Sequence, residues 1–70
     1  MYDVRIYYRD QINESDRISN IVDIANEKGI GTTTSKASIG LSFYDLEFPI
    51  VEINSRLFGY KDGLERIKEC

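Results

Sequence analysis

Histidine is absent from this 70-residue sequence, and cysteine occurs once, at position 70. Without histidine, neither a Cys-His nor a Ser-His catalytic arrangement can form. A single cysteine permits no intramolecular disulfide and no zinc site built on paired cysteines. We interpret Cys70 as an exposed terminal thiol without function, because the negative charges of Glu69 and the chain end disfavour a reactive thiolate. The residues therefore predict no catalytic site and no metal site.

The sequence also lacks a long apolar run and an excess of basic residues. No stretch approaches the ~20 apolar residues of a membrane helix, and the opening "MYDVRIYYRD" has no apolar signal-peptide core. We therefore expect a cytoplasmic protein that makes no membrane contact. The net charge is -3 and the pI about 4.8, so we expect no nucleic-acid binding, which needs clustered Lys and Arg.

What is present is the composition of one small globular domain, residues 1–70. Hydrophobic residues make up 41% and charged residues 30% of the chain. A domain of this size buries only about 60% of the surface that its unfolded chain exposes. There is room for one sheet and two or three short helices.

Residues 2–9 alternate, which predicts a strand. Tyr2, Val4, Ile6 and Tyr8 fall on one face, and Arg5, Tyr7 and Arg9 fall on the other. Residues 12–29 predict a helix, with an apolar stripe formed by Ile18, Ile21, Val22 and Ala25. Asn13 or Ser15 is the expected N-terminal cap, and Gly29 suits the left-handed C-terminal position.

The second half of the chain predicts more sheet and a closing helix. The threonines near 31–36 favour a short strand, while 38–46 reads as a short helix or an irregular turn. Residues 49–54 form a predicted strand that opens with the only proline, Pro49, where a missing N–H does little harm. A turn at 54–55, an antiparallel strand at 56–60 and a helix at 62–69 follow. In that helix Asp62 is the expected cap, and Tyr60, Leu64 and Ile67 form the apolar stripe.

This order, together with three segments, resembles the glutaredoxin branch of the thioredoxin superfamily. The segments are Glu47-Phe48-Pro49, then "IVEINSR", then Phe58-Gly59-Tyr60-Lys61-Asp62. Glutaredoxins carry a Thr-Val-Pro stretch, two strands joined by a turn, and Gly-Gly-x-Asp-Asp before the last helix. The resemblance covers 47–67 and 2–29 and is poor over 30–46.

The resemblance implies an α/β, thioredoxin-like fold. Its central mixed sheet would have four strands (or three), with helices mainly on one face and the middle helix short or absent. We expect Val4, Ile6, Tyr8, Val51 and Ile53 to pack under the first and last helices. We also expect the strand from Pro49 to run parallel beside the N-terminal strand, and the Phe48–Pro49 bond to be cis rather than trans. A ferredoxin-like arrangement is the alternative fold.

The cysteine pair of glutaredoxins is missing. By alignment its two positions fall on Ile12 and Ser15, and neither residue carries the thiolate that disulfide exchange requires. Ile12 instead suits a hydrophobic staple before the helix. The resemblance matches Tyr60 and Asp62 to the glutathione-binding segment, but Phe58 and Lys61 depart from its pattern, and Asp62 is explained equally well as a cap.

The hypothesis that follows is a redox-inactive, glutaredoxin-like protein-binding or regulatory module, of the kind that phages and accessory elements encode, with no cofactor. The expected contact residues are Phe48, Pro49, Gly59, Tyr60 and Asp62, together with Arg5 and Tyr7 on a second sheet face where Arg5 pairs with Glu52. Two alternatives stay open. One is weak binding of glutathione or a peptide through the Pro49 backbone and Asp62, and the other is thiol–disulfide exchange by Cys70.

Overall fold

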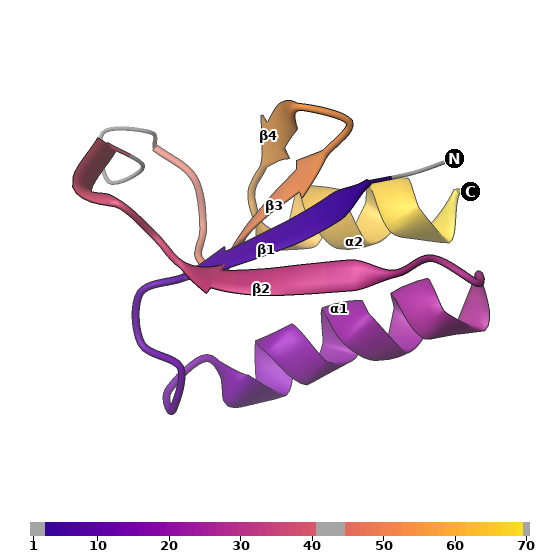
Figure 1. Cartoon of the computed structure of the whole chain (residues 1–70), viewed down its shortest axis with the longest axis horizontal. Coiled ribbons are helices and arrows are strands. Elements are labelled where there is room, and N and C mark those ends of the chain that lie inside the picture. Colours follow the sequence, from indigo (N-terminus) through magenta and orange to yellow (C-terminus); the bar gives the residue numbers. More distant parts are fainter. Residues whose placement is uncertain (1–2, 41–44, 70) are drawn as a thin grey trace.

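A computed structural model describes residues 3–40 and 45–69 (Figure 1). The element order is β1 (Val4–Tyr8), α1 (Ser15–Glu27), β2 (Thr32–Lys36), β3 (Ile50–Ile53), β4 (Arg56–Phe58) and α2 (Tyr60–Lys68). All four expected strands are present, each trimmed by one or more residues at its ends, and α1 starts three residues later than the pattern predicted.

The strands form one mixed sheet in the order β2-β1-β3-β4. β1 and β2 are parallel, with Val4 opposite Thr32, and α1 makes the crossover between them. β3 is antiparallel to β1 and β4 is antiparallel to β3. Our expectation of a parallel β3 was therefore wrong. The connection from β2 returns to the sheet at the end where β1 and β2 finish, so β3 must run back along β1 (Figure 1).

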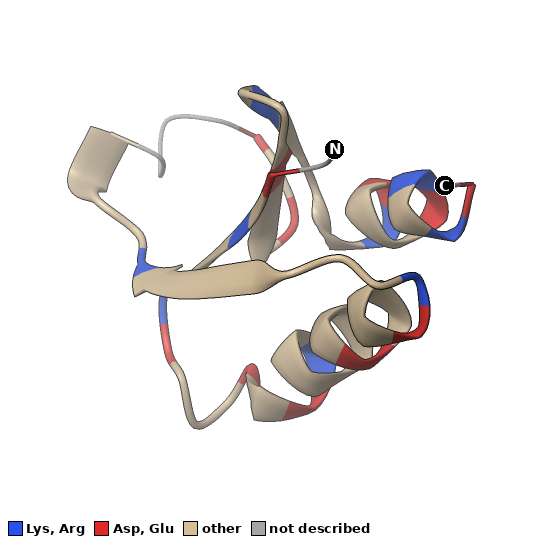
Figure 2. Ribbon diagram, turned by 45° about the vertical axis from the view of Figure 1, so that its right-hand side comes forward, with Lys and Arg blue, Asp and Glu red and all other residues tan. Residues whose placement is uncertain are grey.

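Both helices pack against the same face of the sheet, as Figure 2 shows. The core on this face takes side chains from both central strands and both helices: Val4, Ile6, Ile21, Ala25, Val51, Ile53, Tyr60 and Ile67. Four of the five strand residues expected here are present. Tyr8, the fifth, is only half-buried and lies outside the core, at the end of β1.

α2 begins earlier than its sequence pattern indicated. Gly59 is the N-cap residue and Tyr60 starts the helix, which places Asp62 in the first turn instead of at the cap. Asp62 there still complements the helix dipole. Gly63 is buried against β3: a Cβ atom on it would lie 2.5 Å from Val51 Cβ. The glycine therefore sets how closely α2 approaches the sheet.

The N-terminal end of α1 is built differently from the prediction. Glu14 occupies the cap position without a side-chain cap bond, so neither Asn13 nor Ser15 serves as the cap. Ile12 is 84% exposed, which rules out the hydrophobic staple. The C-terminal end matches the prediction, since Gly29 has a φ of 72°.

Between β2 and β3, the described residues 37–40 and 45–49 contain no α-helix, although a single short 3₁₀ turn occurs at 39–40. The remaining residues of the expected short helix, 41–44, lie outside the described part of the chain, as does Cys70. β3 and β4 are joined by the expected tight turn at Asn54 and Ser55, both with positive φ. Across the described residues, neither helix has the length and apolar character needed to cross a membrane.

Candidate functional site

The proline loop, residues 47–49, leads directly into β3. The Phe48–Pro49 peptide bond is cis, as the resemblance implied. The Tyr60 N–H donates to the Glu47 carbonyl at 3.0 Å, which ties the loop to the start of α2. A Cβ atom on Gly59 would lie 3.2 Å from the Glu47 nitrogen, so the two backbones are in close contact. The structure thus brings four of the predicted site residues together.

These four residues are also buried. Phe48 is 8% exposed and Tyr60 is 9% exposed, while Pro49 and Gly59 are buried as well. Residues this buried in the isolated chain support the surface around them and offer little area of their own to a partner.

Arg17 of α1 contacts both the proline loop and Tyr60. The sequence did not predict this role for Arg17. Its guanidinium donates to the Phe48 carbonyl at 2.9 Å and lies 3.7 Å from the Glu47 carboxylate. The same group lies 4.9 Å from the centre of the Tyr60 ring. Arg17 stands four residues before the core residue Ile21, so helical spacing places it on the sheet-facing side of α1, and that spacing was the available signal.

Two further side chains complete the contacts around the proline loop. The Asn20 amide donates to the Tyr60 hydroxyl at 3.0 Å, and the Arg9 guanidinium lies 4.2 Å from the centre of the Phe48 ring. The loop carbonyl, both aromatic rings and the tyrosine hydroxyl are therefore all engaged by residues of this chain.

The loop before α1, residues 9–14, is held by carboxylates. Asp10 accepts the N–H groups of Ile12 at 3.0 Å and Asn13 at 3.2 Å. Glu14 in turn accepts the Asp10 N–H at 2.9 Å. The resemblance places the cysteine pair in this segment. Here two carboxylates accept the backbone N–H groups of the loop, and the Ile12 side chain is exposed to solvent.

The sheet face opposite the helices carries the Arg5–Tyr7 face, which we define as Arg5, Tyr7 and Glu52. Arg5 faces Glu52 across β1 and β3, with Nε 3.9 Å from Oε1, as expected. The Tyr7 hydroxyl donates to the same carboxylate at 3.3 Å. A hydrogen bond with Tyr7, followed by the charge of Asp3, raises the pKa of Arg5, so Arg5 stays protonated at any physiological pH.

The seven predicted site residues thus divide among separate places. Phe48, Pro49, Gly59 and Tyr60 form one buried cluster, Arg5 and Tyr7 lie on the opposite sheet face, and Asp62 is exposed on α2. Within the described residues, no group of three or more cysteine, aspartate or glutamate side chains is placed to hold a metal ion. Comparison with protein-family models, with curated proteins and with solved structures found no match to this chain.

Proposed function

We propose that this chain is a redox-inactive, glutaredoxin-like module that binds a protein partner through the Arg5–Tyr7 face. One observation carries the proposal: both helices cover the same side of the sheet, and among residues 3–40 and 45–69 no α-helix covers the other side of β1 and β3. The Arg5 side chain is 54% exposed and the Glu52 side chain is 25% exposed. Arg and Tyr are enriched at protein interfaces, so this face has the composition of a contact surface.

Support for the glutaredoxin-like part comes from element order and from the surroundings of Pro49. The β-α-β unit comes first, the proline directly precedes the central β3, and the hairpin leads into a last helix beside the first. Helices on one face and a connection without an α-helix in its described residues also fit the resemblance. Strand direction lends no support, because we expected a parallel β3 and it is antiparallel.

Support for the absence of redox chemistry comes from the loop before α1. The aligned positions hold Ile12 and Ser15, neither of which can form a disulfide. The carboxylates of Asp10 and Glu14 occupy the backbone N–H groups there. Negative charge at this place opposes a thiolate, which is the species that attacks a disulfide.

Glutathione or peptide binding at the proline loop gains less support. A peptide that pairs with the loop would use its backbone acceptors, and one of the two lone pairs of the Phe48 carbonyl already accepts from Arg17. The Glu47 carbonyl likewise accepts from Tyr60. A peptide would have to share or displace these contacts, whereas the Arg5 side chain on the opposite sheet face is 54% exposed.

The test is site-specific photocrosslinking in a lysate of the native host. A benzophenone amino acid is placed at position 7, or at position 23, an exposed aspartate on the outer side of α1. One discrete crosslinked protein from position 7 and none from position 23 is expected. Excess unlabelled chain should compete for this crosslink, an Arg5→Glu variant should fail to compete, and the matched Lys61→Glu variant on α2 should compete fully.

Equal crosslinking from both positions, or full competition by Arg5→Glu, would overturn the proposal. The alternatives have their own readouts. Amide shifts at 48–50 and 59–62 on adding millimolar glutathione would favour the ligand site instead. Reduction of a glutathione mixed disulfide that Cys70→Ser abolishes would favour the oxidoreductase.

A further inference from the structure

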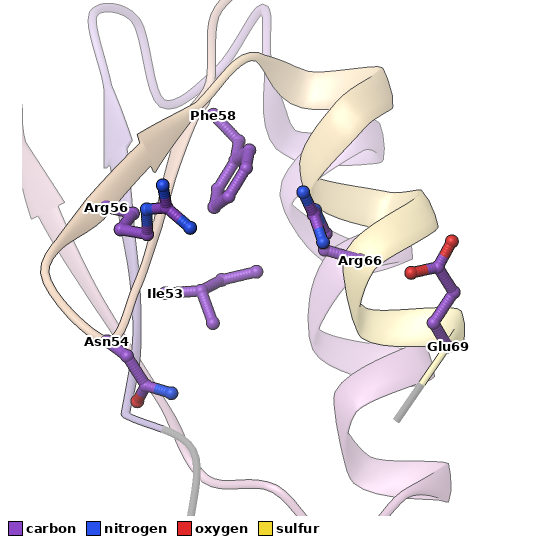
Figure 3. Close-up of a pocket in the computed structure, with 6 residues that line it drawn as sticks. All are labelled: Ile53, Asn54, Arg56, Phe58, Arg66 and Glu69. Atoms are coloured by element: carbon purple, nitrogen blue, oxygen red, sulfur yellow. The ribbon is translucent and has the colours of Figure 1, made fainter.

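A second surface, unrelated to the proline loop and to the Arg5–Tyr7 face, is hollowed between the β3–β4 hairpin and α2. The cavity measures about 250 Å³ and is lined by Ile53, Asn54, Arg56, Phe58, Arg66 and Glu69 (Figure 3). Ile53 is 6% exposed and Phe58 is half-buried, so the floor of the cavity is apolar.

Two guanidinium groups reach this apolar floor from opposite walls. Arg56 extends from β4 and Arg66 from α2, and both point into the space between the hairpin and the helix (Figure 3). Arg66 lies 5.3 Å from the centre of the Phe58 ring, which orients it over the cavity. Two cations converging on an apolar floor in a chain of net charge -3 form a local exception to its acidic surface.

Of the two arginines, Arg56 gives the stronger argument for a bound anion. Among the residues that the structure describes, it forms no ion pair and no ring contact. The lining carboxylate of Glu69 is at the C-terminal end of α2, and in Figure 3 it lies on the far side of Arg66 from Arg56. An arginine fork matches a carboxylate in two parallel hydrogen bonds, so Arg56 offers this cavity a carboxylate-binding group that is not paired with any described carboxylate.

We propose that this cavity binds a carboxylate attached to an apolar group, such as the C-terminal residue of a peptide or a small aromatic acid. The carboxylate pairs with Arg56 and Arg66, and the apolar group lies on Ile53 and Phe58. Small-molecule sites typically measure ~300–1,000 Å³, so a cavity of about 250 Å³ holds one residue and no more. A ligand of this size with a single carboxylate binds with a Kd on the order of 1 mM.

The test is a titration of the ¹⁵N-labelled chain with N-acetyl-phenylalanine, followed by amide and arginine side-chain NMR signals. Saturable shifts are expected at 53–58 and at Arg66. N-acetyl-phenylalaninamide, which has the same ring and no charge, should give no saturable shift. A tetrapeptide ending in phenylalanine separates the sources, because tighter binding than the single residue indicates a peptide end and equal binding indicates a small acid.

Arg56→Gln should weaken binding of N-acetyl-phenylalanine at least tenfold. The matched control is Lys61→Gln, which removes the same charge from the first turn of α2 outside the cavity and should leave the Kd unchanged. Raising the salt to 0.5 M should weaken binding by the wild-type chain. The proposal is overturned if the amide binds as well as the acid, if Arg56→Gln binds like the wild type, or if no shift saturates by 20 mM.

Discussion

The packing of α2 on β3 makes Gly63→Ala a sharp test of the fold. In an exposed helix this change stabilises by about 0.5–1 kcal/mol, because alanine is the better helix former. Here the new Cβ would stand 2.5 Å from Val51 Cβ and 2.6 Å from its Cγ2. Val51 is fully buried on a central strand and has no room to withdraw. Overpacking a core costs typically 1–3 kcal/mol, and this contact belongs at the upper end.

We therefore expect Gly63→Ala to lower the free energy of unfolding by about 2 kcal/mol, the overpacking cost less the gain in helix propensity. For a domain of this size that corresponds to a fall in Tm of roughly 8–16 °C. Thermal and urea denaturation followed by circular dichroism measure both quantities. The reasoning is refuted if the variant is as stable as the wild type.

A control and a rescue make the Gly63 result specific. Gly31 has nothing within 4 Å of an added Cβ and no positive φ, so Gly31→Ala should be neutral or slightly stabilising. Val51→Ala removes the two methyl groups that the new Cβ would meet at 2.6 and 3.1 Å and keeps the Cβ at 2.5 Å, so it relieves part of the overlap. The double variant should therefore be more stable than the sum of the two single losses predicts, which a double-mutant cycle measures.

Two further predictions concern the proline loop. Arg17→Met removes the bond to the Phe48 carbonyl and should cost about 1 kcal/mol, which is below the ~1.5–3 kcal/mol of a buried charged hydrogen bond because the Arg17 side chain is 44% exposed. The control Lys61→Met, measured by the same urea denaturation, should cost less than half of that. Tyr60→Phe deletes the acceptor of the Asn20 amide and should cost about 1 kcal/mol, and adding Asn20→Ala should then cost almost nothing more; additive losses in the urea midpoints would contradict that bond.

The sequence predicted the elements well because their patterns are local. Alternation in β1 and the apolar stripe of α1 are periodic over several residues, and the left-handed Gly29 is a single-residue signal. The Arg5–Glu52 pair also followed, since residues on one face of adjacent strands meet once the register is guessed. These features need no knowledge of the third dimension beyond strand adjacency.

What the sequence did not predict depends on packing between distant segments. The direction of β3 depends on where the connection from β2 re-enters the sheet, and residues 37–49 carry no periodic signal for that. Arg17 contacts a carbonyl 31 positions away. Every residue has a backbone carbonyl, so the sequence does not indicate which one accepts the bond. The start of α2 was missed because Asp62 is a good cap residue, but the close contact of Gly59 with the proline loop fixes the helix two residues earlier.

A last prediction concerns the carboxylate-held loop before α1 and asks whether a cysteine placed there would be reactive. In Ile12→Cys the new thiol would be exposed, and its own backbone N–H would bond to Asp10 at 3.0 Å. A negative charge this close disfavours the thiolate, so we expect the thiol pKa to lie at or above about 8.5, the ordinary value. The rate of iodoacetamide alkylation against pH measures this thiol pKa, in a Cys70→Ser background.

A second variant tests the cause. Adding Asp10→Asn keeps an acceptor for the turn and removes the charge, and should lower the thiol pKa. A pKa below about 7 with Asp10 intact is the behaviour of an activated catalytic cysteine. It would show that the loop favours a thiolate and would remove the physical argument for the proposed redox-inactive module.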